Sequence, residues 1–101
     1  MQSRYDLLRR HREDILEALA QRGANDVRVF GSIARGEDES DSDIDLLVEL
    51  PGERSSGSEL LDVLALSEVL TKLVGTRVDV VTARSLRPDI RELAIAEAVP
   101  L

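Results

Sequence analysis

The segment from residue 27 to residue 48, VRVFGSIARGEDESDSDIDLLV, constrains the fold of this chain more than any other. One apolar run is followed directly by Gly31-Ser32, and a second begins at Ile44, between Asp43 and Asp45. Successive side chains of a strand point to opposite faces, so the two aspartates share a face, with backbones roughly 6.6 Å apart. Carboxylates this close repel each other unless a cation lies between them. The pattern therefore predicts a pair of Mg²⁺ ligands, because Mg²⁺ is usually held by one or two carboxylates together with substrate phosphates.

The Gly31-Ser32 step predicts a turn from the first strand into a short helix over about residues 32–36. Glycine permits a sharp backbone turn, and serine is a favoured residue at the start of a helix. The free N–H groups of a helix start bind anions, so we expect a phosphate site here, beside the carboxylate pair. The alternative is an acidic, solvated loop in which Ser32 only caps a helix.

Two other kinds of site share part of this pattern but lack residues that they require. Residues 31–36 have the glycine spacing of a P-loop, but Glu37-Asp38 stands where lysine and then serine or threonine are needed. Residues 41–45 open like an EF-hand loop, but Leu46 replaces its central glycine and Gly52 its final glutamate. Neither a P-loop nor an EF-hand is therefore expected.

The combined pattern resembles the signature of the DNA polymerase β-like nucleotidyltransferases, and most closely their smallest members, the minimal nucleotidyltransferases. It consists of Gly31-Ser32, a gap of ten residues, and Asp43-x-Asp45, with Ala34-Arg35-Gly36 between them. The family also carries a third carboxylate on a later strand, and Asp79 in the run RVDVV is in the matching place. The resemblance continues to the closing residues EAVPL.

The resemblance implies a magnesium-dependent transfer from ATP. Asp43 and Asp45 would hold two Mg²⁺ ions, and Asp79 would share the second ion or accept the proton of the attacking hydroxyl, which makes it the catalytic residue. Gly31 and Ser32 would hold the β- and γ-phosphates, which leave as pyrophosphate.

Arg35 is the only basic residue in the motif, and we assign it to phosphate contact. A salt bridge to Glu37 or Asp38 is an equally good interpretation. For Asp79, the alternative to a site role is an ion pair with Arg77 or Arg84.

Members of this family are similar to antitoxins that add AMP to a tyrosine of a HEPN-domain ribonuclease toxin. We therefore expect transfer of AMP to a tyrosine hydroxyl of a partner HEPN toxin, with which the chain forms a hetero-oligomer. One alternative is nucleotidyl transfer to a small molecule such as an aminoglycoside, although 101 residues leave no room for an added substrate domain. The other is neutralisation of a partner by binding alone, which would need no repelling carboxylates.

Composition limits the possible partners and compartments. The chain is expected to form a single domain over residues 1–101, with 43% hydrophobic residues, no cysteine and a net charge of −7. Six acidic residues between positions 37 and 45 would repel a nucleic-acid backbone, so a basic protein is the more plausible partner. A charged N-terminus and the lack of a long apolar run favour a cytoplasmic protein without a membrane span.

Periodicity predicts an α/β (α+β) fold, in which helices flank a small sheet, and the resemblance implies the mixed sheet of the nucleotidyltransferase palm. Helices are expected over residues 4–22, 59–74 and from about 85 to 99, and strands over residues 27–30, 43–50 and 77–82. In the last helix Ile90, Leu93, Ala94 and Ala98 are expected to pack inward. His11 and Tyr5, which have no catalytic partners in the sequence, are expected to be structural.

Overall fold

The computed structural model describes residues 4–37, 43–52 and 56–101. The elements in chain order are α1 (Arg4–Arg10), α2 (Arg12–Ala20), β1 (Asn25–Phe30), β2 (Ile44–Glu49), α3 (Ser56–Val74), β3 (Val78–Thr82), the 3-10 helix η1 (Ala83–Ser85), α4 (Pro88–Glu97) and β4 (Val99–Pro100). The strands form one sheet in the order β3-β2-β1-β4. β2 and β3 are parallel, whereas β1 runs antiparallel to both of its neighbours. The expected mixed sheet flanked by helices is confirmed.

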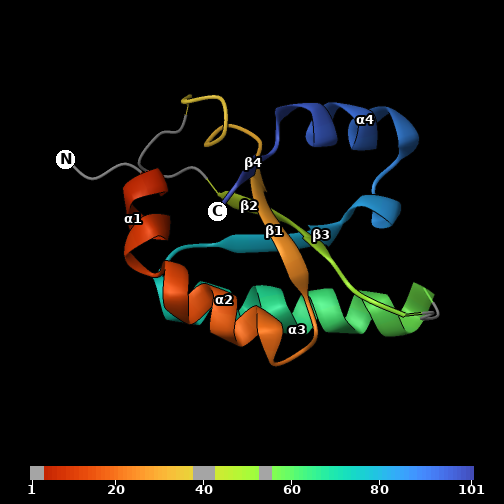
Figure 1. The fold of residues 1–101 in the computed structure, drawn as a ribbon, viewed down its shortest axis with the longest axis horizontal. Helices are drawn as coiled ribbons and strands as arrows, with labels where there is room; N and C mark the ends of the chain where they lie inside the picture. Colours follow the sequence, from red (N-terminus) through yellow and green to blue (C-terminus); the bar gives the residue numbers. More distant parts are fainter. Residues whose placement is uncertain (1–3, 38–42, 53–55) are drawn as a thin grey trace.

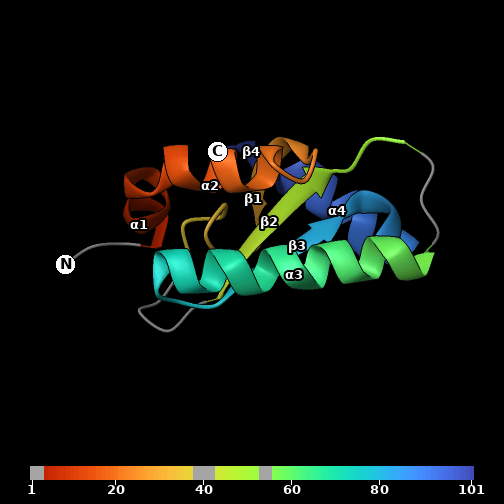
Figure 2. The same ribbon diagram turned by 90° about the horizontal axis from the view of Figure 1, so that it is seen from below.

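The main core lies between the sheet and the helices of one layer. Figure 1 shows α2 and α3 on one side of the sheet and α4 on the other, and Figure 2 shows α2 and α3 running alongside each other. Fully buried side chains on this side come from α1 and α2, from the strands and from α3: Leu8, Ile15, Leu19, Val29, Leu46, Val78, Leu66 and Leu70. None of the helices in the described ranges is long and apolar enough to cross a membrane.

The central strand β2 is buried on both faces. Leu46 and Val48 face the core beneath the sheet, and Leu47, between them, is also almost completely buried. On β3, Val78 and Val80 enter the same core, so Asp79 between them must face the opposite side. The alternation expected from the sequence is therefore confirmed for both strands.

The outer edge of β3 is closed by hydroxyl groups. The backbone N–H groups of Val78 and Val80 donate to the side chains of Thr71 (3.0 Å) and Ser67 (2.9 Å) of α3. The N–H of Thr82 donates to the hydroxyl of Ser85 in η1, at 3.3 Å. Unpaired donors on an edge strand invite another strand to pair with them. These three hydroxyl contacts therefore protect this edge of the sheet.

Several element boundaries differ from those expected. The helix predicted over residues 4–22 is interrupted at His11, whose φ of −99° and ψ of 11° separate α1 from α2. Residues 31–36 form hydrogen-bonded turns rather than the predicted short helix. α3 begins at Ser56, three residues before the predicted start. The predicted boundaries were based on the spacing of apolar residues. That spacing continues across the break at His11, so it could not show where one helix ends and the next begins.

The C-terminal end of the chain contains a strand that the sequence did not predict. Val99 and Pro100 pair with Val29 and Arg28 of β1 and form the second edge of the sheet. The prediction that Leu93 of α4 packs inward is wrong, because its side chain is 62% exposed.

Ile90 is likewise 40% exposed, whereas Ala94 is buried as predicted and Ala98 is half-buried. The helix lies on the less covered side of the sheet and buries only a narrow face, so its apolar residues do not all reach the interior.

Candidate active site

The acidic residues singled out in the sequence come from two neighbouring strands. Asp45 of β2 and Asp79 of β3 are register partners in the parallel pair, so their side chains lie on the same face of the sheet. Asp43 immediately precedes β2. Arg77 lies near two of the three aspartates, with its Nε 3.9 Å from a carboxylate oxygen of Asp43 and 3.4 Å from one of Asp79. The structure thus brings the three carboxylates to one place, and the alternative ion pair of Asp79 with Arg77 is also present.

The surroundings of Asp45 disfavour its negative charge. The pKa of Asp45 is raised to about 6, first because the group is partly buried and next because of the nearby charges of Asp79 and Asp43. Arg35 acts in the opposite direction. A half-buried carboxylate held against like charges is costly for the protein, and a bound cation would remove that cost.

The donor set fits Mg²⁺ in its chemistry but is not a closed cage. Within the described ranges, no group of three or more acidic or histidine side chains is arranged to hold a metal ion by itself. Mg²⁺ commonly keeps several waters and takes only one or two carboxylates, with substrate phosphates completing its shell. An open carboxylate group is therefore compatible with an ion that arrives with a nucleotide.

Gly31 lies directly against Asp45 at the end of β1. Its φ is +77°, and a Cβ atom at this position would be 2.5 Å from Oδ2 of Asp45. Its carbonyl accepts a hydrogen bond from the N–H of Arg35 (3.2 Å), and the next carbonyl, that of Ser32, accepts one from Glu37 (2.8 Å). Glycine is therefore required at position 31 for two reasons: the backbone has a positive φ, and the carboxylate of Asp45 occupies the space that a Cβ atom would need.

Glu97, to which the sequence analysis gave no role, lies in the site. Its carboxylate accepts hydrogen bonds from the N–H of Gly31 (3.0 Å) and from Nη1 of Arg35 (3.0 and 3.1 Å). The register of β4 explains this placement: Val99 pairs with Val29, and continuing the pairing by two residues puts Glu97 opposite Gly31. No local pattern could have found it, because the contact spans 66 residues and depends on a strand that was not predicted.

Arg35 extends across the turn between two acidic side chains. Its Nε donates to Glu37 at 3.0 Å, and its Nη1 donates to Glu97. These two hydrogen bonds, with Glu37 first, raise the pKa of Arg35. The predicted salt bridge to Glu37 is confirmed, whereas Asp38, its alternative partner, lies outside the described residues.

Arg84, the other possible partner of Asp79, pairs instead with Glu59 at 2.5 Å. His11 is at the break between α1 and α2, and Tyr5 packs against the core. Among the residues named in the sequence, Asp43, Asp45 and Asp79 lie together at the centre of the candidate site.

Comparison with known proteins agrees with the geometry. The model of the nucleotidyltransferase domain family matches residues 12–100. The chain is 37% identical over 93 residues to the protein adenylyltransferase MntA of Thermococcus cleftensis, covering 92% of this chain and 87% of that protein. A structure described as a minimal nucleotidyltransferase superposes with a TM-score of 0.76 and 49% identity, covering 93% of this chain and 92% of the other.

A toxin–antitoxin crystal structure with AMP-PNP shares the fold, with a TM-score of 0.70 and 20% identity over 87% of this chain and 69% of that one. The family model spans most of the chain, and the sequence relative is covered over most of its length. The chain therefore belongs to the nucleotidyltransferase family.

Proposed function

We propose that this chain transfers AMP from ATP to a tyrosine hydroxyl of a HEPN-domain toxin and thereby acts as its antitoxin. The observation that carries the proposal is the register pair Asp45–Asp79, which places two carboxylates side by side next to the Gly31 turn. The chain's relative from Thermococcus cleftensis is named a protein adenylyltransferase, which supports a protein as the acceptor.

In the proposed reaction, Asp43 and Asp45 would hold two Mg²⁺ ions, and Asp79 would share the second ion or take the proton of the acceptor hydroxyl. The metal would neutralise the α-phosphoryl group and the leaving pyrophosphate during an in-line displacement. Gly31 and Ser32 would bind the β- and γ-phosphates through the turn. The carboxylate of Glu97 accepts the hydrogen bond of the Gly31 N–H, so a phosphate that binds there must replace it.

Arg35 is part of this turn, and we propose that it contacts the phosphates. Its present partners, Glu37 and Glu97, are both carboxylates, so its guanidinium already binds groups with the charge and the oxygen atoms of a phosphate.

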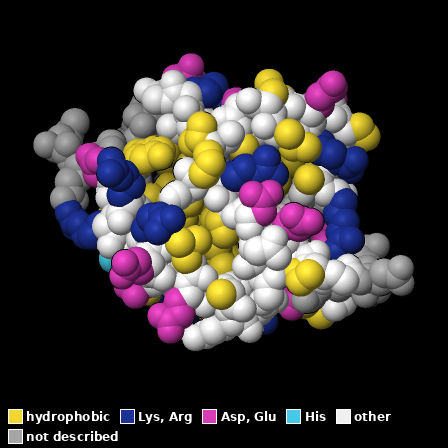
Figure 3. All heavy atoms as spheres, in the orientation of Figure 1, with side chains coloured by type: hydrophobic (Ala, Val, Ile, Leu, Met, Phe, Trp, Pro, Cys, Tyr) yellow, Lys and Arg dark blue, Asp and Glu magenta, His cyan; other side chains and the backbone are white. Residues whose placement is uncertain are grey.

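Exposed apolar surface supports a protein acceptor rather than a small polar one. Figure 3 shows apolar side chains gathered at the centre of one face, with charged side chains around them. Large hydrophobic side chains are also exposed on the N-terminal half of α3 and on α4: Leu60, Leu61, Leu64, Ile90, Leu93 and Ile95. Exposed apolar side chains that gather on a surface are typical of contacts between proteins. A net charge of −7 favours a basic partner, and we place the reaction in the cytoplasm, where ATP and Mg²⁺ are available.

The test is intact mass spectrometry of the co-encoded HEPN protein after incubation with this chain, ATP and Mg²⁺. A gain of one or more adenylyl masses, absent with Asp43→Asn, together with loss of ribonuclease activity, is the expected result. An unmodified but inhibited partner would contradict the proposal and indicate neutralisation by binding. Label on an aminoglycoside instead would indicate a small-molecule transferase.

A further inference from the structure

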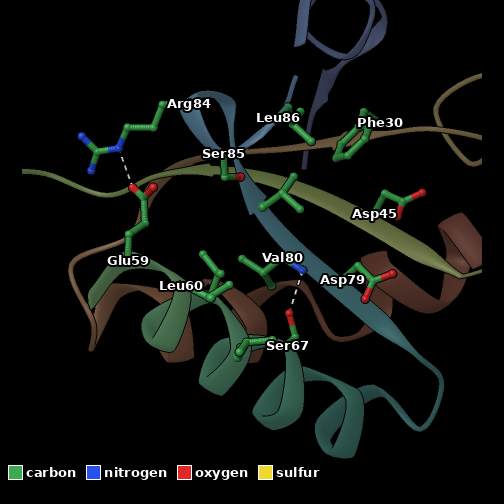
Figure 4. A pocket seen from close by; sticks show the side chains of 13 residues that line it. Phe30, Asp45, Glu59, Leu60, Ser67, Asp79, Val80, Arg84, Ser85 and Leu86 are labelled. Carbon is green, nitrogen blue, oxygen red and sulfur yellow. Dashed lines mark hydrogen bonds and ion pairs between the residues drawn. The ribbon is translucent and has the colours of Figure 1, made fainter. Parts of the chain in front are cut away.

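A cavity beside β3 has its two ends lined by different chemistry. It has a volume of about 800 Å³ and lies between the N-terminal half of α3, β3 and η1. Figure 4 shows Asp45 and Asp79 at one end and the ion pair of Glu59 with Arg84 at the other. We name the space between them the β3–α3 groove, with apolar walls formed by Phe30, Leu60, Val63, Leu64, Val81 and Leu86.

Resting on the proposed function, we infer that the β3–α3 groove binds the partner segment that carries the acceptor tyrosine. The acceptor hydroxyl has to approach from the side opposite to the leaving pyrophosphate. Gly31, Ser32 and Arg35 belong to the proposed phosphate turn, and none of the three lines the groove. In phosphoryl transfer the attacking and leaving oxygens lie roughly in line on opposite sides of the phosphorus. If pyrophosphate leaves on the Gly31 side of the carboxylates, the nucleophile arrives from the groove side.

The polarity of the groove lining matches that of a tyrosine side chain. A phenol has an apolar ring and a polar tip, and the groove has apolar walls that end at two carboxylates. A ring packed against these walls with its hydroxyl toward that end of the groove would bring the oxygen toward Asp45 and Asp79. The cavity falls in the size range of pockets that hold whole ligands, so it has room for the residues on either side of the tyrosine.

The outer edge of β3 limits the way in which a partner segment can dock. The outward N–H groups of Val80 and Thr82 are already bound by the hydroxyls of Ser67 and Ser85. The partner therefore cannot pair with these donors as an added strand. Its contacts must come from side chains, and Leu60 and Leu64, which are 56% and 57% exposed, present one apolar row for them on α3.

The first experiment compares two charge substitutions on the same helix. Leu64→Glu places a carboxylate in the groove wall, whereas Val69→Glu places one at a 45% exposed position outside it. Transfer of AMP to the co-encoded HEPN protein is followed by intact mass, and the affinity for ATP with Mg²⁺ by calorimetry. We expect Leu64→Glu to slow transfer at least about tenfold with unchanged ATP affinity, as for a central interface residue, and Val69→Glu to match the parent chain.

Equal transfer rates for the two variants would overturn the inference. So would a loss of ATP affinity in Leu64→Glu that matches its loss of transfer, since the groove would then hold the adenosine. If the parent chain modifies no HEPN protein, the proposed function fails and the inference fails with it.

A second measurement does not depend on catalysis. The chain contains no cysteine, so Leu64→Cys and Val69→Cys each create a unique thiol. Bound HEPN protein should slow the reaction of a maleimide with the thiol at position 64 but not at position 69, as measured by the mass of this chain. Equal labelling of both thiols in the complex would show that the groove is not covered by the partner.

Discussion

The contact between Gly31 and Asp45 gives the sharpest test of how the fold builds the site. Gly31→Ala should be destabilising for two reasons. A residue with a Cβ atom pays about 1–2 kcal/mol in the left-handed conformation, and the new methyl group would be 2.5 Å from Oδ2 of Asp45. Moving that carboxylate off its rotamer adds about 0.5–1.5 kcal/mol.

Gly36→Ala is the matched control. Gly36 belongs to the same turn and has a similar φ of +72°, but a Cβ atom there would meet nothing within 4 Å. It should therefore show the backbone cost alone. Urea unfolding in EDTA should give a free energy of unfolding for Gly31→Ala that is lower than that of Gly36→Ala by about 0.5–1.5 kcal/mol. AMP transfer should fall about a hundredfold only in Gly31→Ala, because the carboxylate oxygen that we propose as a metal ligand is displaced.

A double-mutant cycle isolates the contact. In an Asp45→Ala background the carboxylate is absent, so the extra cost of Gly31→Ala over Gly36→Ala should disappear. If the extra cost persists there, Gly31 is required only for its backbone, and our account of the contact is wrong. Equal loss of transfer in the two glycine variants would refute the claim that Asp45 is the link between this turn and the chemistry.

Three further predictions follow from the charges of the site. In EDTA, the free energy of unfolding should fall as the pH rises from about 4 to about 6, because folding favours the protonated form of Asp45, whose pKa is raised to about 6. Asp45→Asn should flatten this pH dependence, keep or raise the melting temperature and abolish AMP transfer. A marked drop in its melting temperature would mean that the carboxylate of Asp45 has a structural role. ATP should bind far more weakly in EDTA than with Mg²⁺, because the unneutralised carboxylates repel the triphosphate, and equal affinities by calorimetry would contradict a metal role. Glu97→Gln should bind ATP with Mg²⁺ about two- to tenfold more tightly, corresponding to about 0.4–1.4 kcal/mol, because a negative charge leaves the Gly31 turn; weaker binding would show instead that Glu97 holds the turn in its active shape.

The sequence alone determined which residues can form the carboxylate group and which way they face. Alternation along a strand has a period of two, so a buried Val78 and Val80 require Asp79 to face the other side wherever β3 lies in the sheet. The same local rule places Asp43 and Asp45 on one face. The need for glycine before Ser32 was also visible as a sharp turn, although the space taken by Asp45 was not.

Only the tertiary structure decided what lies next to these residues. Strand order depends on how all the apolar faces are buried together, so the parallel pairing that aligns Asp45 with Asp79 could not be obtained from periodicity. The hydrogen bond from the Gly31 N–H to Glu97 depends on the register of β4 against β1, two strands that are far apart in the sequence. The exposure of Leu93 likewise reflects which side of α4 meets the sheet. Local patterns specify the direction of a side chain along its own element, whereas its neighbours are set by packing between elements that are distant in sequence.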